Sequence, residues 1–148
     1  MSTEDNKRVV ATFVEVCQNR HDLAFADEVF HPDFVNHYAP EGRPMPAGQS
    51  PVEHFKHFYG LLLRAFPDAT MAIDEQLAER DLVATRKTLR GTHRGELWGL
   101  PPTGNRVEWE FIDIFRVRDG KLAEHWTHMD LEALRAQMRP HDPAGGER

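Results

Sequence analysis

The spacing of apolar residues changes near the middle of this 148-residue chain. As far as Phe66 they recur every three or four positions, as on one face of a helix, and from Ala69 onward they alternate with polar residues, as in a strand. Helices followed by strands predict an α+β domain. We therefore expect N-terminal helices to pack on one face of a curved, mostly antiparallel sheet and to enclose a pocket lined by alternate strand residues.

Start and turn signals mark out the individual elements. Ser2-Thr3 and Ser50-Pro51 are helix starts, because Ser and Thr cap helices and Pro suits the first turn. Asp119-Gly120 is a hairpin turn, because both residue types tolerate a positive φ. The expected helices cover about 3–17, 23–30, 51–66 and 131–138, the expected strands cover 70–77, 82–92, 107–117 and 122–129, and a proline-rich loop covers 39–51.

Charge and cysteine content narrow the classes of function. Eighteen basic against twenty-four acidic residues give a formal charge of −6, which repels phosphate backbones and argues against a nucleic-acid partner. No apolar run reaches the ~20 residues of a membrane helix, and we find no secretory signal. The single cysteine, Cys17, lies on the apolar stripe of the first helix, so we expect a core residue in a cytoplasmic protein. We expect one domain over residues 1–148, with 139–148 as a flexible tail.

Side chains alternate between two faces along the last expected strand. Trp126, His128 and Asp130 share one face, while His125 points to the other. An imidazole and a carboxylate beside apolar surface suit proton transfer near neutral pH, so Asp130 and His128 are the candidate catalytic pair. The alternative is structural, because Asp130 is also placed to cap the helix that begins at Leu131.

The preceding strand divides in the same way. Its aromatic row holds Trp109, Phe111, Asp113 and Phe115. A carboxylate buried among aromatic side chains must be hydrogen-bonded or functional, so Asp113 is either a structural acceptor or a pocket residue. The opposite row holds Glu108, Glu110, Ile112, Ile114 and Arg116. Its charged members are expected to meet solvent or another subunit.

Several polar residues lie near the ends of expected elements. Asn36 and His37 lead into the proline-rich loop, where they can orient a substrate carbonyl; the alternative is a turn in which Asn36 bonds its own backbone. His93 follows a strand and belongs either to the pocket rim or to an exposed loop. His54 and His57 are spaced i, i+3, but no third ligand is indicated, so we expect a solvated face and no metal site.

Several kinds of catalytic motif are missing from the sequence. It contains no Gly-x-Ser-x-Gly nucleophile elbow, no phosphate-binding glycine-rich loop and no dinucleotide fingerprint. The remaining kinds of function are acid–base chemistry without a cofactor and the binding of a ligand without catalysis.

A series of longer motifs, taken in order, is similar to that of a known family. The motifs are His31-Pro32-Asp33-Phe34-Val35-Asn36-His37, Phe66-Pro67-Asp68, Arg90-Gly91-Thr92-His93-Arg94-Gly95, Pro101-Pro102-Thr103-Gly104 and the stretch from Ile112 to Trp126. From about Lys7 to Met138 the chain resembles the SnoaL-like polyketide cyclase group of the NTF2-like superfamily. That resemblance implies an α+β cone fold.

The resemblance also implies a reaction and a site. It implies an intramolecular aldol condensation that closes the last ring of an aromatic polyketide, with no metal or other cofactor. The family's acid/base aspartate near the end of the last strand corresponds to Asp130. The family's imidazole partner falls at Arg116, a departure that points to a proton route through His128 or His93. The resemblance further implies a homodimer formed through the outer sheet face, and Asn36 and His37 match the family's pocket-lining stretch. We expect Phe111, Phe115 and Trp126 to form the flat apolar walls for an aromatic substrate.

Two other readings use the same fold. The pocket can serve a dehydratase, an isomerase or a hydrolase of another small carbonyl compound, since a fold does not fix a function. It can also belong to a binder of small molecules or a dimeric accessory domain without catalysis, in which case Asp130 is only a helix cap.

Overall fold

The computed structural model describes residues 1–37 and 48–140. The expected loop at 39–51 and the expected tail at 139–148 therefore lie largely outside the described residues. The elements in chain order are α1 (Thr3–Phe13), η1 (Val14–Asn19), η2 (Leu23–Phe25), α2 (Ala26–Val29), β1 (Phe30–Asn36), α3 (Pro51–Ala65), β2 (Thr70–Glu79), β3 (Leu82–Thr92), β4 (Arg106–Arg118), β5 (Lys121–Thr127) and α4 (Leu131–Gln137).

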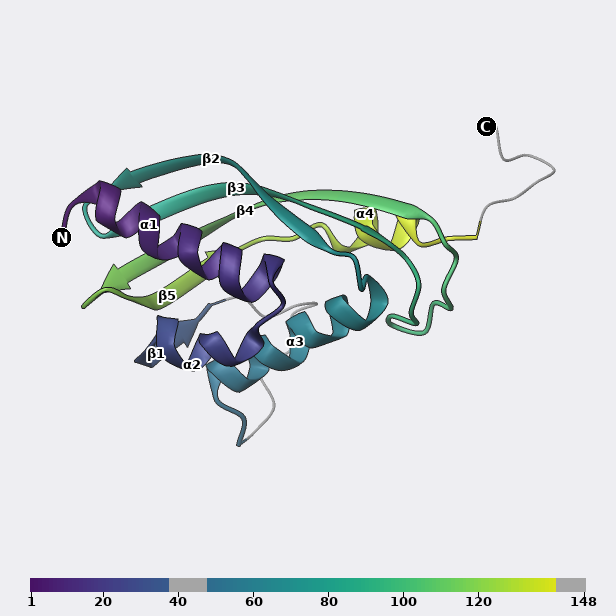
Figure 1. Ribbon diagram of the computed structural model, residues 1–148, viewed down its shortest axis with the longest axis horizontal. Helices are drawn as coiled ribbons and strands as arrows, with labels where there is room; N and C mark the ends of the chain where they lie inside the picture. The colour runs from purple at the N-terminus through teal and green to yellow at the C-terminus, as the bar shows by residue number, and fades with distance from the viewer. Residues whose placement is uncertain (38–47, 141–148) are drawn as a thin grey trace.

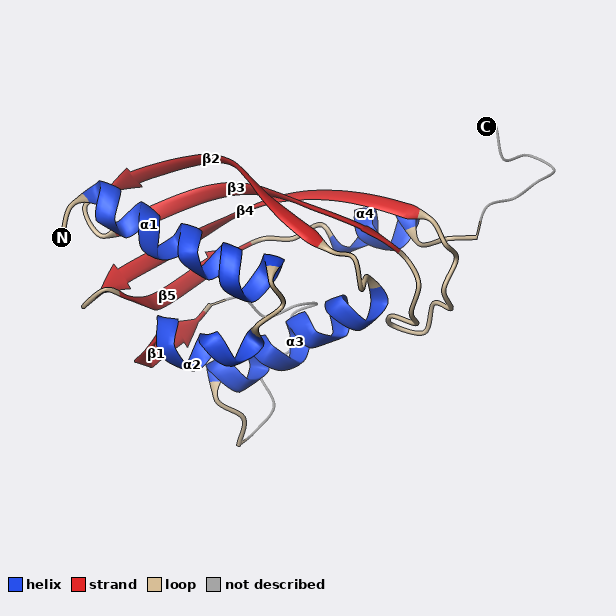
Figure 2. Ribbon diagram, viewed as in Figure 1, coloured by secondary structure: helices blue, strands red, loops and turns tan. Residues whose placement is uncertain are grey.

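One curved sheet of five strands forms the frame, in the order β1-β5-β4-β3-β2. The pairs from β2 to β5 are antiparallel, whereas β1 runs parallel to β5. Helices α1, α2 and α3 lie beneath the concave side of this sheet (Figures 1 and 2). The expected α+β cone, with helices on one face of a mostly antiparallel sheet, is confirmed.

The edge strand β1 was not expected from the sequence. Its partner β5 lies about ninety positions further on, with Asn36 opposite His125. The strand contains Pro32, which lacks a backbone N–H and is tolerated at a sheet edge. Because β1 has neither clean alternation nor a hairpin partner, its local sequence gives no strand signal. Its pairing is what brings Asn36 beside the last strand.

The helix starts form as expected. Ser2 and Ser50 each accept a hydrogen bond from the backbone N–H three residues on, and Asp5 and Glu53 complete the two capping boxes. The first helix continues past Phe13 as a π-helical turn, η1. The Asn19 side chain ends this turn and holds it to β2, because its amide oxygen accepts from Met71 N at 2.7 Å and its amide nitrogen donates to Met71 O at 3.0 Å.

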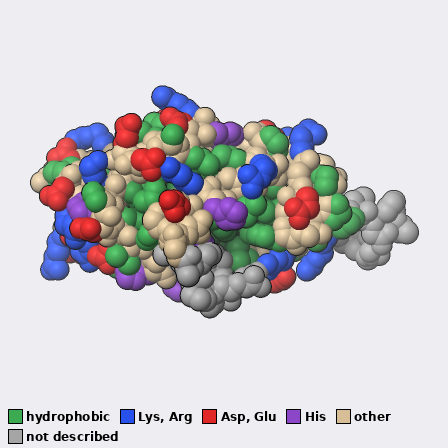
Figure 3. All heavy atoms as spheres, turned by 90° about the horizontal axis from the view of Figure 1, so that it is seen from below, with side chains coloured by type: hydrophobic (Ala, Val, Ile, Leu, Met, Phe, Trp, Pro, Cys, Tyr) green, Lys and Arg blue, Asp and Glu red, His purple; other side chains and the backbone are tan. Residues whose placement is uncertain are grey.

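The two faces of β4 differ as the alternation predicts. The face of β4 toward the helices is buried. It carries Val107, Trp109, Phe111, Asp113, Phe115 and Val117. On the outer face Ile112 is 54% exposed and Ile114 is 37% exposed. On the surface seen from the side of the helices, acidic, basic and apolar side chains are interspersed (Figure 3). Among the described residues, no helix is both long and apolar enough to cross a membrane.

Candidate active site

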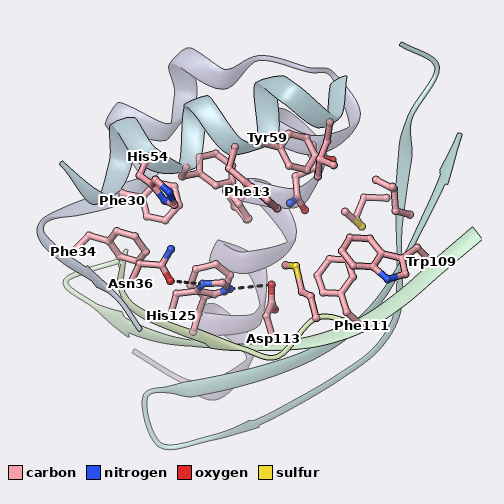
Figure 4. A pocket seen from close by; sticks show the side chains of 18 residues that line it. Phe13, Phe30, Phe34, Asn36, His54, Tyr59, Trp109, Phe111, Asp113 and His125 are labelled. Carbon is pink, nitrogen blue, oxygen red and sulfur yellow. Dashed lines mark hydrogen bonds and ion pairs between the residues drawn. The ribbon is translucent and has the colours of Figure 1, made fainter. Parts of the chain in front are cut away.

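A pocket opens between the helices and the concave face of the sheet (Figure 4). Its walls are mainly aromatic, which suits a flat, apolar ligand. These walls include Phe13, Phe30, Phe34, Phe55, Phe58, Trp109, Phe111 and Phe115.

One side of the pocket is polar, and His125 stands at its centre. The His125 Nδ1 atom lies 3.0 Å from Asn36 Oδ1. On the other side of the ring, His125 Nε2 lies 3.5 Å from Asp113 Oδ2. All three side chains line the pocket, and the ring sits between its two partners in Figure 4. The His125 side chain is 12% exposed and that of Asp113 is 4% exposed, so the ring is the more open member of the pair.

A buried lysine lies behind Asp113. The Lys87 Nζ atom is 2.8 Å from Asp113 Oδ2, and the Lys87 side chain is fully buried. Burial alone would raise the pKa of Asp113. The Lys87 ammonium and the His125 ring outweigh that effect and hold the pKa of this carboxyl below its ordinary value. Asp113 is therefore a carboxylate at neutral pH.

The charge of Asp113 decides where the proton sits on a neutral His125 ring. A carboxylate can only accept hydrogen bonds, so it favours the tautomer with the proton on Nε2. The lone pair is then on Nδ1, the side toward Asn36. As placed, the Asn36 amide oxygen faces Nδ1 and can accept from a protonated ring; after rotation of the amide, its nitrogen can donate to the Nδ1 lone pair. The arrangement suits a histidine that gains and loses a proton at Nδ1.

Four of the sequence-predicted site residues do line the pocket. They are Asn36, Phe111, Asp113 and Phe115. Their role in catalysis or binding stays a prediction.

Asp130 lies elsewhere, and the expectation that it sits inside an apolar pocket is wrong. Asp130 is exposed and does not line the pocket. Its carboxylate accepts from Ala133 N at 3.0 Å and caps α4, which is the structural alternative weighed above. The chain has left β5 at Thr127, so strand alternation no longer governs the direction of this side chain.

We expect Asp130→Ala to lower the free energy of unfolding by about 1 kcal/mol, because it removes the cap of α4. Asp130→Asn should be nearly neutral, since Asn caps helices about as well as Asp. Urea denaturation monitored by circular dichroism measures both changes. If Asp130→Asn stays folded but loses more than about 100-fold in turnover, a scale typical of acid–base groups, Asp130 is catalytic after all.

His128 and Trp126 face the outer side of the sheet. Both border a shallow outer surface with Ile112, Ile114 and Arg116, and His128 is exposed. The division of β5 into two rows is correct, but the row that faces the helices is that of His125. The structure therefore contradicts the expected position of Trp126 as a pocket wall and of His128 beside the substrate.

His37 and Arg116 also belong to this outer side. The His37 ring stacks on Trp126 with centroids 4.9 Å apart, and His37 Nε2 lies 2.9 Å from Glu124 Oε2. Arg116 is paired with Glu124 and with Asp81, each at 2.7 Å. Neither His37 nor Arg116 lines the pocket, so Arg116 does not replace an imidazole there.

His93 is buried away from the pocket, in the segment after β3. Its Nδ1 lies 3.0 Å from Thr103 Oγ1, and its ring packs against Phe66. Burial lowers the pKa of His93. This is neither of the two expected positions, rim or exposed loop, because the 93–105 segment folds back on the end of α3, where Arg94 N and Gly95 N donate to Ala65 O.

Sequence reasoning missed five polar residues at or next to the pocket, one of which is Gln18 on η1. His54 and Tyr59 on α3 line the pocket, which corrects the expectation that His54 lies on a solvated face. His57 is exposed, as expected. His125 pairs directly with Phe115, so the aromatic row of β4 could have identified its face. Lys87 lies between Thr85 and Leu89 in the buried row of β3, a charged residue where an apolar one is usual.

Cys17 is the core residue that the sequence predicts. It is fully buried. Burial raises its pKa to about 12, which disfavours a thiolate. Among residues 1–37 and 48–140, no group of three or more His, Cys, Asp or Glu side chains is placed to hold a metal ion.

Comparison with protein families gives a match over most of the chain. Residues 8–138 match the family model described as SnoaL-like polyketide cyclase. The chain is 28% identical over 113 residues to nogalonic acid methyl ester cyclase from Streptomyces nogalater, covering 76% of this chain and 81% of that protein. It is 31% identical over 99 residues to aklanonic acid methyl ester cyclase DnrD from Streptomyces peucetius, covering 66% of each.

Solved structures show the same fold. AclR from Streptomyces galilaeus, described as a candidate hydroxylase, superposes with a TM-score of 0.78 and 33% identity, over 93% of this chain and 97% of that one. IdmH from Streptomyces antibioticus, described as a candidate polyketide cyclase, gives a TM-score of 0.77 and 33% identity, over 90% of this chain and 97% of that one.

Proposed function

Because this chain belongs to the SnoaL-like polyketide cyclase family, we propose that it closes a ring in a polyketide-like methyl ester by cofactor-free, intramolecular aldol chemistry. The observation that carries the proposal is the polar group on one side of the aromatic pocket, where His125 is held between Asn36 and the buried Asp113. The named substrates of the two cyclase relatives supply the substrate class.

In this proposal His125 serves first as the base and then as the acid. The Nδ1 lone pair takes a proton from a carbon flanked by carbonyl groups, and the resulting enolate carbon bonds to the second carbonyl carbon of the same molecule. The alkoxide formed there takes the proton back from Nδ1, so no proton is gained or lost overall. Asp113 stabilises the intermediate imidazolium, as a carboxylate does behind a catalytic histidine.

The remaining pocket residues orient the substrate. The aromatic walls hold a planar ring system, and the two reacting carbons come together without the entropic cost of a bimolecular encounter. The Asn36 amide is close enough to His125 to contact the same substrate oxygen, and it can donate to an enolate or alkoxide. In this proposal Asn36 therefore positions the substrate oxygen beside the proton carrier.

The test is incubation of the purified protein with nogalonic acid methyl ester and with aklanonic acid methyl ester, followed by liquid chromatography and mass spectrometry. We expect a cyclised isomer of unchanged mass. A product lighter by one water would indicate a dehydratase instead. Raised thermal stability with no turnover of either ester would indicate a binder and would contradict the proposed reaction.

We also propose that the outer sheet face, around Ile112, Ile114 and Trp126, joins two copies of the chain. Two exposed isoleucines beside a tryptophan form an apolar surface that association would bury. We expect Ile114→Lys to convert a dimer into a monomer, as measured by light scattering during size-exclusion chromatography. Thr12→Lys adds the same charge to exposed α1 and should leave the mass unchanged. A monomeric wild-type protein at micromolar concentration would contradict this proposal.

A further inference from the structure

Lys87 is a fully buried lysine in the middle of β3. Burying an ammonium group is costly unless the charge is paired. Its pair is Asp113, 2.8 Å away, and the Gln18 side-chain oxygen accepts from Lys87 Nζ at 3.4 Å. Three aromatic rings also surround the ammonium, with centroids 5.4 to 5.8 Å from Nζ. Lys87 is thus held in one place by a compact set of partners.

Lys87 does not line the pocket, so it is not placed to touch a substrate. It does share an atom with the candidate active site. The same oxygen, Asp113 Oδ2, lies next to Lys87 Nζ on one side and next to His125 Nε2 on the other, at 2.8 Å and 3.5 Å. The ammonium of Lys87 and the ring of His125 are therefore linked electrostatically through one carboxylate oxygen.

A contribution to stability is the alternative explanation for the buried ion pair between Lys87 and Asp113. Buried pairs can often be replaced by apolar residues with little loss of stability, so stability alone does not explain a lysine at this position. The shared oxygen points to a role in the charge state of the site. We propose that Lys87 is a positioning residue that keeps Asp113 in its carboxylate form and thereby fixes the proton of neutral His125 on Nε2.

Removing Lys87 would reverse this arrangement. A carboxyl group in an apolar site without a counter-charge favours its neutral form. The neutral acid donates a hydrogen bond to the His125 Nε2 lone pair, so the single proton of the neutral ring lies on Nδ1 and the basic lone pair faces Asp113. For its effect on catalysis the inference rests on the proposed function, because a ring with its lone pair on Nε2 has no free base on the Asn36 side.

The other titratable groups lining the pocket belong to α3. They are His54 and Tyr59, and burial lowers the pKa of His54 and raises that of Tyr59. Among the described residues, neither side chain forms a hydrogen bond or an ion pair with Asp113 or Lys87. The His54 ring therefore serves as an internal reference in the experiment.

The test is nuclear magnetic resonance of protein labelled with ¹⁵N in its histidines and ¹³C in its aspartates, without substrate. In the wild type we expect the Nε2–H tautomer of His125 and an ionised Asp113 at pH 7. In Lys87→Met we expect an Asp113 that is still protonated at pH 7, a rise in its titration midpoint of about 3–5 pH units as for other fully buried carboxyl groups, and therefore the Nδ1–H tautomer of His125. Val83→Ala, a buried change on the same face of β3, should alter neither signal.

The inference is overturned if Lys87→Met keeps the Nε2–H tautomer with Asp113 still ionised, or if wild-type Asp113 is protonated at pH 7. Should Lys87→Met fail to fold, Lys87→Gln takes its place, and the wild-type measurement still decides. The spectra need no turnover. Expected spectra without cyclisation would therefore reject only the proposed function, whereas cyclisation with an unchanged tautomer in the variant would reject only the role of Lys87.

Discussion

His125→Gln should reduce the rate of ring closure by about 10²–10⁴-fold, the usual contribution of one acid–base group. Glutamine can still hydrogen-bond to Asn36 and Asp113, so we expect the pocket and the fold to persist. It cannot carry a proton from the acidic carbon to the alkoxide oxygen, so kcat should fall while KM changes little. Steady-state kinetics on an accepted ester measures both constants, and circular dichroism checks the fold.

His128→Gln separates this assignment from the one based on strand alternation. His128 is exposed on the outer face, so we expect wild-type kinetics from this variant. A large loss at His128 combined with full activity in His125→Gln would place the proton carrier on the outer face and contradict the site described here.

Asp113→Asn should lower the free energy of unfolding by about 3–5 kcal/mol at pH 7, because it leaves the Lys87 ammonium buried without a counter-charge. Lys87→Met combined with Asp113→Asn removes both charges and should recover much of that loss. Urea denaturation of the wild type and of these two variants measures the difference. Glu108→Gln is the control, since its ion pair with Arg90 is largely exposed and should be worth less than about 1 kcal/mol.

The difference in the free energy of unfolding between the wild type and Asp113→Asn should change with pH in one direction. The pKa of folded Asp113 lies below its ordinary value of 3.8, so the stabilisation is complete above that pH. It is lost as the pH falls through the folded pKa. We therefore expect the gap between wild type and Asp113→Asn to be constant from pH 7 to about 5 and to narrow below 3.8. A gap that narrows already near pH 6 would show that Asp113 is not held ionised by Lys87.

Local sequence was sufficient for much of the fold. The capping signals at Ser2 and Ser50 start helices because a hydroxyl beside the first turn has one set of partners, the nearby backbone N–H groups. Alternation separated the buried row of β4 from its exposed row, and it correctly placed Asp113 among the aromatic side chains. These features depend on neighbours within a few residues, which a sequence displays directly.

The candidate site needed the tertiary structure. Alternation shows which residues of β5 share a face of the strand. It does not show which of the two faces the helices cover. That choice is made by contacts with distant segments, among them β1, whose Asn36 reaches His125 across about ninety residues. The proposed role of Lys87 likewise follows only from its contact with Asp113 on the neighbouring strand.

The sequence by itself therefore determined the order of the elements apart from β1, the α+β class and the family, because these follow from local spacing and from motifs that are close together in the chain. Only the tertiary structure decided that the polar group of the pocket is Asn36, His125, Asp113 and Lys87, while Asp130 caps a helix outside it. The physical reason is that charge, burial and proton position are set by neighbours in space, and the pairing of distant strands selects those neighbours.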